Sequence, residues 1–205
     1  MLGGTPTLRR QFGEALPAET VVSRHTGRMD HADHVALIRP GVEDRPGAWA
    51  DLGSGTGAFT LALADVLGGR GSIVSVDRDR GALEEQRRHM AARFPEATVD
   101  YRVADFTKSL ELPALDGVLM ANSLHFSRDK AAVLRGILAC VRPGGRFVLV
   151  EYDADHGNPW VPHPLSYATW ERLAPTVGLT GTRLGGRVPS RFLGAIYSAV
   201  SDNSG

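Results

Sequence analysis

The sequence predicts an α/β fold built on a mostly parallel sheet that ends in an antiparallel hairpin. Short apolar segments alternate with helical patterns of about 10 to 15 residues over most of the chain, as in successive βαβ units. A glycine-rich turn joins the first apolar segment to the helical pattern after it. Near the C-terminus the short segment 185–191 separates the last two strands. It cannot hold a helical crossover, so these two strands should be antiparallel.

Helix breakers and hydrophobic periodicity place the elements of the first half of the chain. The turn Pro40-Gly41 should end the first helix, and Pro95 should end the third. Apolar residues recur at helical spacing after the glycine turn, and the run 72–76 that follows is short and apolar. The expected elements are helix 29–38, strand 47–50, helix 58–67, strand 72–77, helix 80–94 and strand 98–103.

The second half continues the alternation until the hairpin. The segment Phe147 to Val150 is continuously apolar, which is typical of a strand buried on both faces, and the turn Pro143-Gly144-Gly145 precedes it. The expected elements are strand 116–120, helix 130–141, strand 146–151, helix 166–177 and strands 179–184 and 192–200.

Composition limits the class of protein. The 205 residues suffice for one domain, and Lys plus Arg equals Asp plus Glu at 23 each, so no net field favours nucleic acid or an acidic membrane. The one cysteine, Cys140, excludes an internal disulfide and should be a small buried residue. Residues 1–28 are expected to form a flexible segment or lid, 29–200 the domain and 201–205 a frayed tail. Without a secretory leader or a membrane-length apolar run, the expected location is cytoplasmic.

The seven-residue turn Asp51-Leu52-Gly53-Ser54-Gly55-Thr56-Gly57 stands where the first strand meets the next helix. Its alternate glycines allow positive φ angles and a close approach of a ligand, while the first N–H groups of the helix face the same point. Asp77 ends the second strand twenty residues after Gly57, where a carboxylate can accept hydrogen bonds from a ribose. No lysine follows the turn, which argues against a phosphate-binding loop of NTPase type. Turn and acid together predict half of a nucleotide-like cofactor site.

Five motifs in order resemble those of the class I S-adenosylmethionine-dependent methyltransferases, in particular the small-molecule branch that includes the ubiquinone and menaquinone biosynthesis methyltransferases. They are Asp51 to Gly57, Val76-Asp77-Arg78, Val103-Ala104-Asp105-Phe106, Leu115 to Phe126, and Leu138 to Glu151 with Arg142-Pro143-Gly144-Gly145-Arg146-Phe147. The resemblance covers roughly residues 28 to 200. It implies a Rossmann-like, doubly wound sheet of seven strands with the last strand inserted antiparallel, which agrees with the expected hairpin.

The resemblance also implies that S-adenosylmethionine is the cofactor. Asp77 should bind both ribose hydroxyls, and Asp105 should accept a hydrogen bond from the adenine amino group. Asp51 should hold either the turn or the cofactor ammonium, while Ala121 and Asn122 should close over the sulfonium side. The residues implied in cofactor binding are Asp51, Gly53, Ser54, Gly55, Thr56, Gly57, Asp77, Arg78, Ala104, Asp105, Phe106, Ala121 and Asn122.

His125 is the candidate catalytic base, because it follows the fourth expected strand at the mouth of this site. The alternative is that its ring packs against the sheet edge or bonds a loop carbonyl. Displacement at a sulfonium depends mainly on positioning, so a base helps only where the acceptor has a proton to lose.

Three further residues are candidates for binding the acceptor. Glu151 and Tyr152 end the fifth strand, at the edge where open α/β sheets bind ligands; the alternative is that they cap the strand end. Trp160 lies in the proline-rich loop 155–164, which we expect to cover the site together with residues 10–35; the alternative is surface packing.

Other polar residues carry no site. His31 and His34 share a face of the first helix, but two ligands without a third at recognisable spacing do not predict a metal site, so no metal is expected. That face is expected to be solvated or part of a substrate lid. Asp65 and the run Glu84 to Arg88 are expected on solvated helix faces.

The sequence thus predicts an enzyme that transfers a methyl group to O, N, S or C of a small, partly apolar molecule. One alternative is a non-catalytic S-adenosylmethionine-binding regulatory protein of the same fold. Another is an NAD-dependent oxidoreductase, which shares the turn and Asp77 but is disfavoured by the hairpin and by Asp105. The expected partner is a small-molecule acceptor rather than nucleic acid, and a homodimer is left open.

Overall fold

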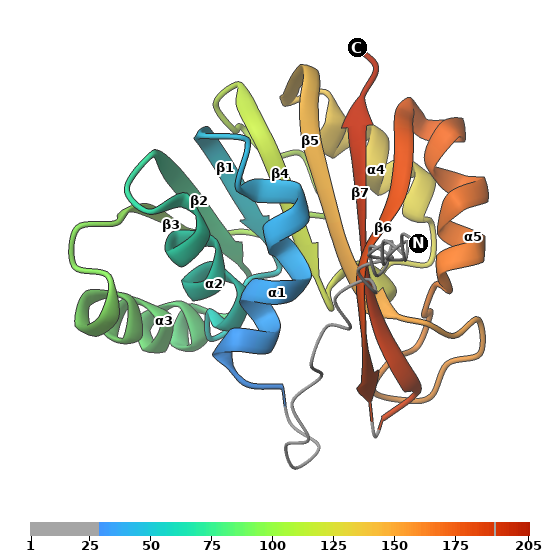
Figure 1. The fold of residues 1–205 in the computed structure, drawn as a ribbon, viewed down its shortest axis with the longest axis horizontal. Coiled ribbons are helices and arrows are strands. Elements are labelled where there is room, and N and C mark those ends of the chain that lie inside the picture. Colours follow the sequence, from blue (N-terminus) through green and yellow to red (C-terminus); the bar gives the residue numbers. More distant parts are fainter. Residues whose placement is uncertain (1–28, 191) are drawn as a thin grey trace, which may run out of the picture.

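A seven-stranded sheet forms the centre of the fold in the computed structural model, which describes residues 29–190 and 192–205 (Figure 1). The expected lid at residues 1–28 lies outside the described residues. The strand order is β3-β2-β1-β4-β5-β7-β6. The strands are β1 Gly47–Leu52, β2 Gly71–Asp77, β3 Thr98–Val103, β4 Leu115–Ala121, β5 Val141–Tyr152, β6 Leu179–Ser190 and β7 Gly194–Asn203.

All strand pairs from β3 to β5 are parallel, whereas β7 is antiparallel to both of its neighbours. The predicted α/β class, seven strands and C-terminal hairpin are therefore confirmed. The parallel strands point downward in Figure 1, so their carboxyl ends face the same side of the molecule as the loop after β5 and the start of β7.

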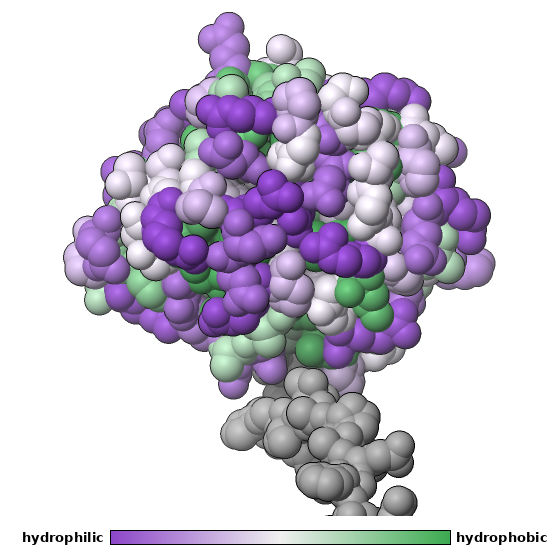
Figure 2. Space-filling model, turned by 45° about the horizontal axis from the view of Figure 1, so that its top comes forward, coloured by the Kyte–Doolittle hydropathy of each residue, from purple (hydrophilic) through white to green (hydrophobic). Residues whose placement is uncertain are grey.

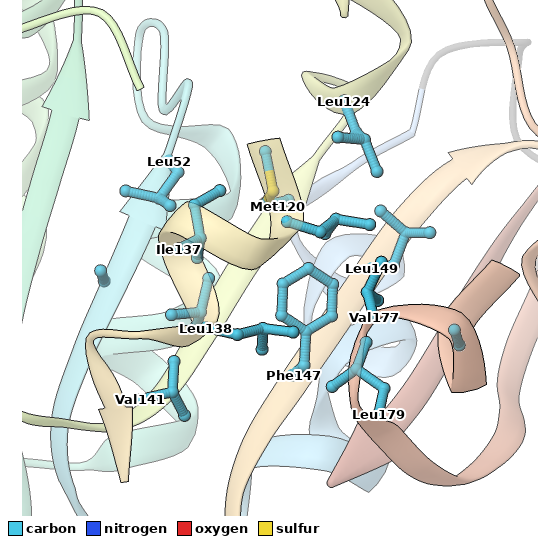
Figure 3. Close-up of a cluster of buried hydrophobic side chains, with 14 of the residues drawn as sticks. Leu52, Met120, Leu124, Ile137, Leu138, Val141, Phe147, Leu149, Val177 and Leu179 are labelled. Atoms are coloured by element: carbon cyan, nitrogen blue, oxygen red, sulfur yellow. The ribbon is translucent and has the colours of Figure 1, made fainter. Parts of the chain in front are cut away.

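Helices cover both faces of the sheet, so successive strand residues enter two different cores. Val148 and Val150 of β5 pack with α1 and α2. Phe147 and Leu149 belong to the other core with α4, α5 and η2, part of which Figure 3 shows. This confirms the prediction that β5 is buried on both faces. The helices are α1 His31–Val42, α2 Ala58–Leu67, α3 Arg80–Arg93, α4 Lys130–Leu138 and α5 Tyr167–Leu173, with the short 3-10 helices η1 Leu124–Phe126 and η2 Ala174–Val177.

The face of the molecule shown in Figure 2 is dominated by hydrophilic and neutral residues. Hydrophobic residues there form small separate areas. No helix in the described parts of the chain is long and apolar enough to cross a membrane.

The first helix continues through Pro40, where the sequence predicted a turn. The Glu43 N–H still donates to the Arg39 carbonyl at 3.1 Å, so the helix ends beyond the proline. The helix packs very closely on the sheet at Gly41, where a Cβ would lie only 2.5 Å from a methyl group of Val148. Tight packing of α1 on the sheet outweighs the one hydrogen bond that a proline removes.

Strand β5 begins five residues earlier than expected and includes a predicted turn. Val141 already pairs with Leu115, and the Pro143-Gly144-Gly145 segment lies within β5 at a shift in the β4–β5 register. Cys140 therefore follows α4 instead of lying in it. Cys140 was expected to be buried, but it is only partly buried. It lines a cavity of about 290 Å³.

The C-terminal tail expected at 201–205 is wrong for its first three residues, which complete β7. Ser201 is fully buried, and the Asn203 side-chain amide donates to the Val141 carbonyl at 2.8 Å. Strand β7 lies between β5 and β6 in the sheet. Residues 201–203 are therefore held in a strand, although their composition alone suggests a frayed tail.

Replacing Asn203 should test this anchoring. Asn203→Ala leaves the buried Val141 carbonyl without its donor, so the free energy of unfolding should fall by about 1 to 3 kcal/mol in urea denaturation. Asn203→Asp, which also cannot donate, should be at least as destabilising. Ser204→Ala removes one solvent-exposed bond to the Gly178 carbonyl and should cost clearly less. Equal losses of stability for Asn203→Ala and Ser204→Ala would mean that the Asn203 amide does not anchor the end of β7.

Candidate cofactor and acceptor site

The glycine turn bends sharply at the carboxyl end of β1. Gly53, Gly55 and Gly57 have φ angles of +77°, +54° and +91°, a region that disfavours any residue with a Cβ. The N–H groups of Gly53 and Ser54 donate to the Val76 carbonyl at 2.8 and 3.1 Å, which fixes the turn against the end of β2. The chain then enters α2 directly at Gly57.

A buried polar network holds the turn from below. Thr60 of α2 donates to Asp51 at 2.6 Å and accepts from the Gln86 amide of α3. The Ser75 hydroxyl of β2 lies 2.8 Å from both Gln86 Oε1 and the Ser54 hydroxyl. Gln86 is fully buried, so the expectation that this part of α3 is a solvated face is wrong for it.

Asp51 lies beneath the turn with only 1% of its surface exposed. Burial raises the pKa of its carboxyl to about 7; the Thr60 hydrogen bond lowers it, and the charge of Asp77 adds to the increase. Of the two predicted roles, holding the turn agrees with this geometry. Contact with a cofactor ammonium stays a prediction.

A cavity of about 480 Å³ opens above the turn. Asp77, at the end of β2, accepts the Gly55 N–H at 2.7 Å and the Asp79 N–H at 2.9 Å, so its carboxylate closes one side of the turn while it faces the cavity. The lining residues are Gly53, Gly55, Thr56, Asp77, Arg78, Asp79, Ala82, Ala104, Asp105, Phe106, Thr107, Asn122, Ser123 and Phe126.

The cavity gathers most of the residues that the resemblance implied. Four implied residues do not line it: Asp51, Ser54, Gly57 and Ala121. The structure also adds lining residues that sequence reasoning missed: Asp79, Ala82, Thr107, Ser123 and Phe126. Asp79 had a usable signal, because its carboxylate caps the N-terminus of α3, as an aspartate before a helix often does.

Asp105 supplies a second carboxylate from the loop after β3. It accepts hydrogen bonds from the Thr107 hydroxyl at 2.6 Å and from the Thr107 N–H at 3.0 Å, and these bonds lower the pKa of Asp105. The carboxylate is thus held ionised and oriented as an acceptor at the cavity wall.

Asn122 has the features of a ligand-binding residue. It is the only described residue other than glycine with a positive φ, +51°, and its backbone is fixed by donation to the Val150 carbonyl at 2.8 Å. Its side-chain oxygen is buried but accepts no hydrogen bond from the described part of the chain, although the residue lines the cavity. A buried acceptor without a donor is costly, so this oxygen fits an N–H or ammonium group of a bound molecule.

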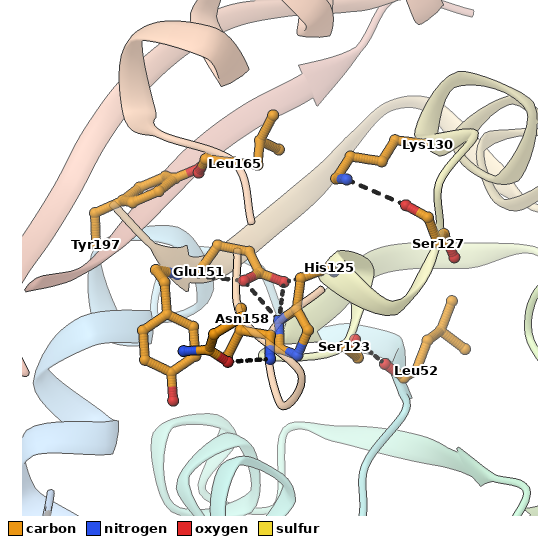
Figure 4. A network of polar contacts seen from close by, with 11 residues as sticks. Leu52, Ser123, His125, Ser127, Lys130, Glu151, Asn158, Leu165 and Tyr197 are labelled. Carbon is orange, nitrogen blue, oxygen red and sulfur yellow. Dashed lines mark hydrogen bonds and ion pairs between the residues drawn. The ribbon is translucent and has the colours of Figure 1, made fainter. Parts of the chain in front are cut away.

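His125 and Glu151 form a buried pair next to the cavity (Figure 4). His125 Nδ1 lies 2.9 Å from Glu151 Oε2, and the backbone N–H groups of His125 and Tyr152 also donate to this carboxylate. Donation from Nδ1 leaves Nε2 with the lone pair, the tautomer that a general base requires. The His125 side chain is only 3% exposed. Its role as a catalytic base stays a prediction.

The three residues predicted to bind the methyl acceptor lie in different environments. Glu151 is fully buried and holds a strand end and His125, which favours the capping alternative over direct contact with an acceptor. Tyr152 is partly exposed, and its ring lies 5.9 Å from that of His125. Trp160 is 70% exposed and contacts Phe192 at the hairpin.

The histidines of α1 are also placed. Asp65 is exposed, as expected, and its Oδ2 also lies 2.8 Å from His31 Nε2, a contact that links α2 to α1. The His34 ring packs against the Phe59 ring in a tilted arrangement, with centroids 4.6 Å apart. Within residues 29–190 and 192–205, no three His, Cys, Asp or Glu side chains group as metal ligands.

Residues 48–175 match a family model described as a methyltransferase domain. The chain belongs to this methyltransferase-domain family. The match covers more than half of the chain and confirms the family that the five motifs indicated.

Two curated relatives illustrate what this methyltransferase domain is similar to. An arsenite methyltransferase from Aquipseudomonas alcaligenes is 33% identical over 112 residues, 51% of this chain and 32% of that protein. The ubiquinone/menaquinone biosynthesis C-methyltransferase UbiE of Shewanella frigidimarina is 29% identical over 125 residues, 60% of this chain and 47% of that protein. The chain thus spans less than half the length of either relative.

Solved structures share the fold at low identity. The YcgJ protein of Bacillus subtilis superposes with a TM-score of 0.69 at 13% identity, covering 85% of this chain and 100% of that one. The N-methyltransferase NodS from Bradyrhizobium japonicum, solved with S-adenosylhomocysteine, gives 0.66 at 17% identity, covering 85% and 87%. These likenesses show that the methyltransferase domain has their fold.

Two alanine substitutions in the turn should differ in their cost to stability. Both glycines have positive φ, but a Cβ at Gly57 would collide with the Gln86 side chain, whereas a Cβ at Gly55 meets nothing within 4 Å. Gly57→Ala should therefore lower the free energy of unfolding by clearly more than the roughly 1 to 2 kcal/mol of backbone strain expected for Gly55→Ala. Urea denaturation of both variants measures the difference; equal losses would contradict the role of Gln86.

The stability of the domain should depend on the protonation of Asp51. Its folded pKa of about 7 exceeds the ordinary aspartate pKa of 3.8, so the folded state binds more protons between these values. The free energy of unfolding should therefore fall as pH rises from about 4 to 7, by at most about 1.4 kcal/mol per pH unit from this group. Asp51→Asn should remove that part of the slope while still accepting from Thr60. Parallel pH profiles for the two proteins would refute the assignment.

Proposed function

We propose that this domain transfers a methyl group from S-adenosylmethionine to a small-molecule acceptor. One observation carries the proposal: the carboxylates of Asp77 and Asp105, from the ends of neighbouring strands, line one cavity with the glycine turn. A nucleoside that bears a cation needs acids and carbonyls in its site, not the cationic clamp that a pyrophosphate needs. Membership of the methyltransferase-domain family supports the same reading.

The residues of the cavity fit the parts of this cofactor. We assign Asp77 to the ribose hydroxyls and Asp105 to the adenine amino group beside Phe106, since all three residues line the cavity. The unpartnered oxygen of Asn122 suits a donor on the amino-acid part of the cofactor. When bound, the sulfonium supplies the reactive methyl group, and the protein supplies orientation and exclusion of water.

His125 is the proposed acceptor of a proton from a hydroxyl or carbon acid. Its Nδ1 is held by the buried Glu151, so the ring orientation is fixed and Nε2 carries the lone pair. Glu151 acts here as a positioning residue, because it reaches an acceptor only through His125. For a neutral amine acceptor, positioning alone carries the transfer.

The alternative functions differ from the proposal in what binds or reacts. An NAD-dependent oxidoreductase would share the glycine turn and Asp77, but the antiparallel β7 and the family match favour methyl transfer. A non-catalytic binding protein would bind the cofactor without turnover. A homodimer and the exclusion of nucleic acid as a substrate stay predictions.

The first experiment is calorimetric titration of the purified chain with S-adenosylmethionine, S-adenosylhomocysteine and NAD in parallel. Micromolar binding of the two sulfur compounds without NAD binding is expected. Asp77→Ala should weaken that binding by about 1 to 3 kcal/mol, because hydrogen bonds to a carboxylate are lost. Asp100→Ala is the matched control, since Asp100 is an exposed acid that pairs with Arg102 on β3.

NAD binding alone would overturn the proposal, as would equal effects of the two substitutions. Cofactor binding without methyl transfer to any acceptor in a screen of quinones, phenols and amines would favour the non-catalytic alternative.

A further inference from the structure

Exposed aromatic side chains gather at the carboxyl edge of the sheet. Phe126, Trp160 and Phe192 are 59%, 70% and 51% exposed, although large apolar side chains are normally buried. They come from η1, from the loop after β5 and from the hairpin between β6 and β7. Segments far apart in the sequence thus bring rings to one edge.

These rings belong to one continuous series of contacts. Phe126 lies 4.3 Å from His125, and His125 lies 5.9 Å from Tyr152, measured between ring centroids. Tyr152 lies 6.1 Å from Phe192, which lies 6.2 Å from Trp160 in an edge-to-face arrangement. The three longer spacings are within the range of favourable aromatic pairs and the shortest is just below it, so the series is packed along its length while its outer rings keep uncovered faces.

The series begins at the cofactor cavity. Phe126 lines that cavity beside Asn122 and Ser123, and its ring contacts His125, the proposed proton acceptor. From there the rings lead outward to the hairpin tip at Phe192. A molecule lying along the series would therefore have one end at the cavity.

Three acidic side chains beside the series have partners among the described residues. Asp153 lies 2.6 Å from Arg187, and Glu151 is held by His125. Asp155 accepts hydrogen bonds from the hydroxyl and the N–H of Ser166. These three carboxylates are therefore engaged within the domain, which suits an uncharged ligand better than a cationic one.

We propose that the methyl acceptor is an uncharged planar aromatic molecule that packs on Tyr152, Phe192 and Trp160 with its reacting end at Phe126. This inference rests on the proposed function, because the acceptor is defined by methyl transfer. Trp160 and Phe192 then determine specificity: they select the flat shape of the ligand and do not take part in the transfer. Loss of either ring should raise KM for the acceptor and leave kcat nearly unchanged.

Tryptophan fluorescence can test this without any turnover. The chain has three tryptophans, and Trp49 and Trp170 are fully buried, so acrylamide quenching reports mainly on Trp160. We would titrate the full chain, with S-adenosylhomocysteine present, with 2-naphthol as a planar probe and with 2-decalol as its saturated, non-planar counterpart. The expected result is that 2-naphthol protects Trp160 from acrylamide and binds more tightly than 2-decalol in calorimetry.

Variants locate the binding. Trp160→Ala and Phe192→Ala should each weaken 2-naphthol binding about tenfold, and Trp160→Phe should recover most of the loss. Leu184→Ala is the matched control, since Leu184 is an apolar residue of the same hairpin, 46% exposed, and has no place in the ring series. S-adenosylhomocysteine binding should be unchanged in all four variants.

Several outcomes would overturn the inference. They are equal binding of the planar and saturated probes, no 2-naphthol binding, no effect of Trp160→Ala, or protection of Trp160 in the free protein, which would mean that other parts of the chain or a second copy cover the rings. Failure of S-adenosylhomocysteine to bind is a separate result that would overturn the proposed function instead.

Discussion

The buried hydrogen bonds beneath the glycine turn are the constraint on which the rest of the site depends. Thr60, Gln86 and Ser75 come from α2, α3 and β2, and they satisfy the polar groups that the turn places in the interior. A buried polar group without a partner costs more than a hydrogen bond contributes, so these elements can pack in only one arrangement. That arrangement puts the end of β2 beside the turn, where Asp77 accepts the Gly55 N–H and faces the cavity.

Much of the fold could be predicted because its cause is local. Alternating strands and helices specify a parallel sheet, and a short final connection specifies a hairpin, whatever the rest of the molecule does. The misplaced elements depend on contacts distant in sequence. Pro40 is accommodated because Gly41 packs on Val148, and Gln86 is buried in a charged run because Thr60 and Ser75 lie opposite it. No periodicity in the sequence carries either fact.

The candidate site divides in the same way. Asp77 and Asp105 were predictable, because parallel strands end at one edge and acids at those ends converge there. Ser54 belongs to the same turn, yet it bonds Ser75 below and does not line the cavity. Which way each residue of a tight turn points is set by φ angles and by the network beneath it. Motif matching assigns the turn as a unit, so it assigned Asp51, Ser54 and Gly57, three turn residues that do not line the cavity.

The antiparallel insertion of β7 brings the proposed acceptor surface next to the cofactor cavity. In a sheet of parallel strands only, each strand would contribute its carboxyl end to the binding edge. Because β7 runs the other way, it begins at that edge, and its pairing of Ile196 with Tyr152 brings the hairpin tip beside the end of β5. Phe192 reaches the Tyr152 ring for this reason. The first four strands therefore build the cofactor cavity, while the hairpin can vary the acceptor surface without disturbing the turn, Asp77 or Asp105.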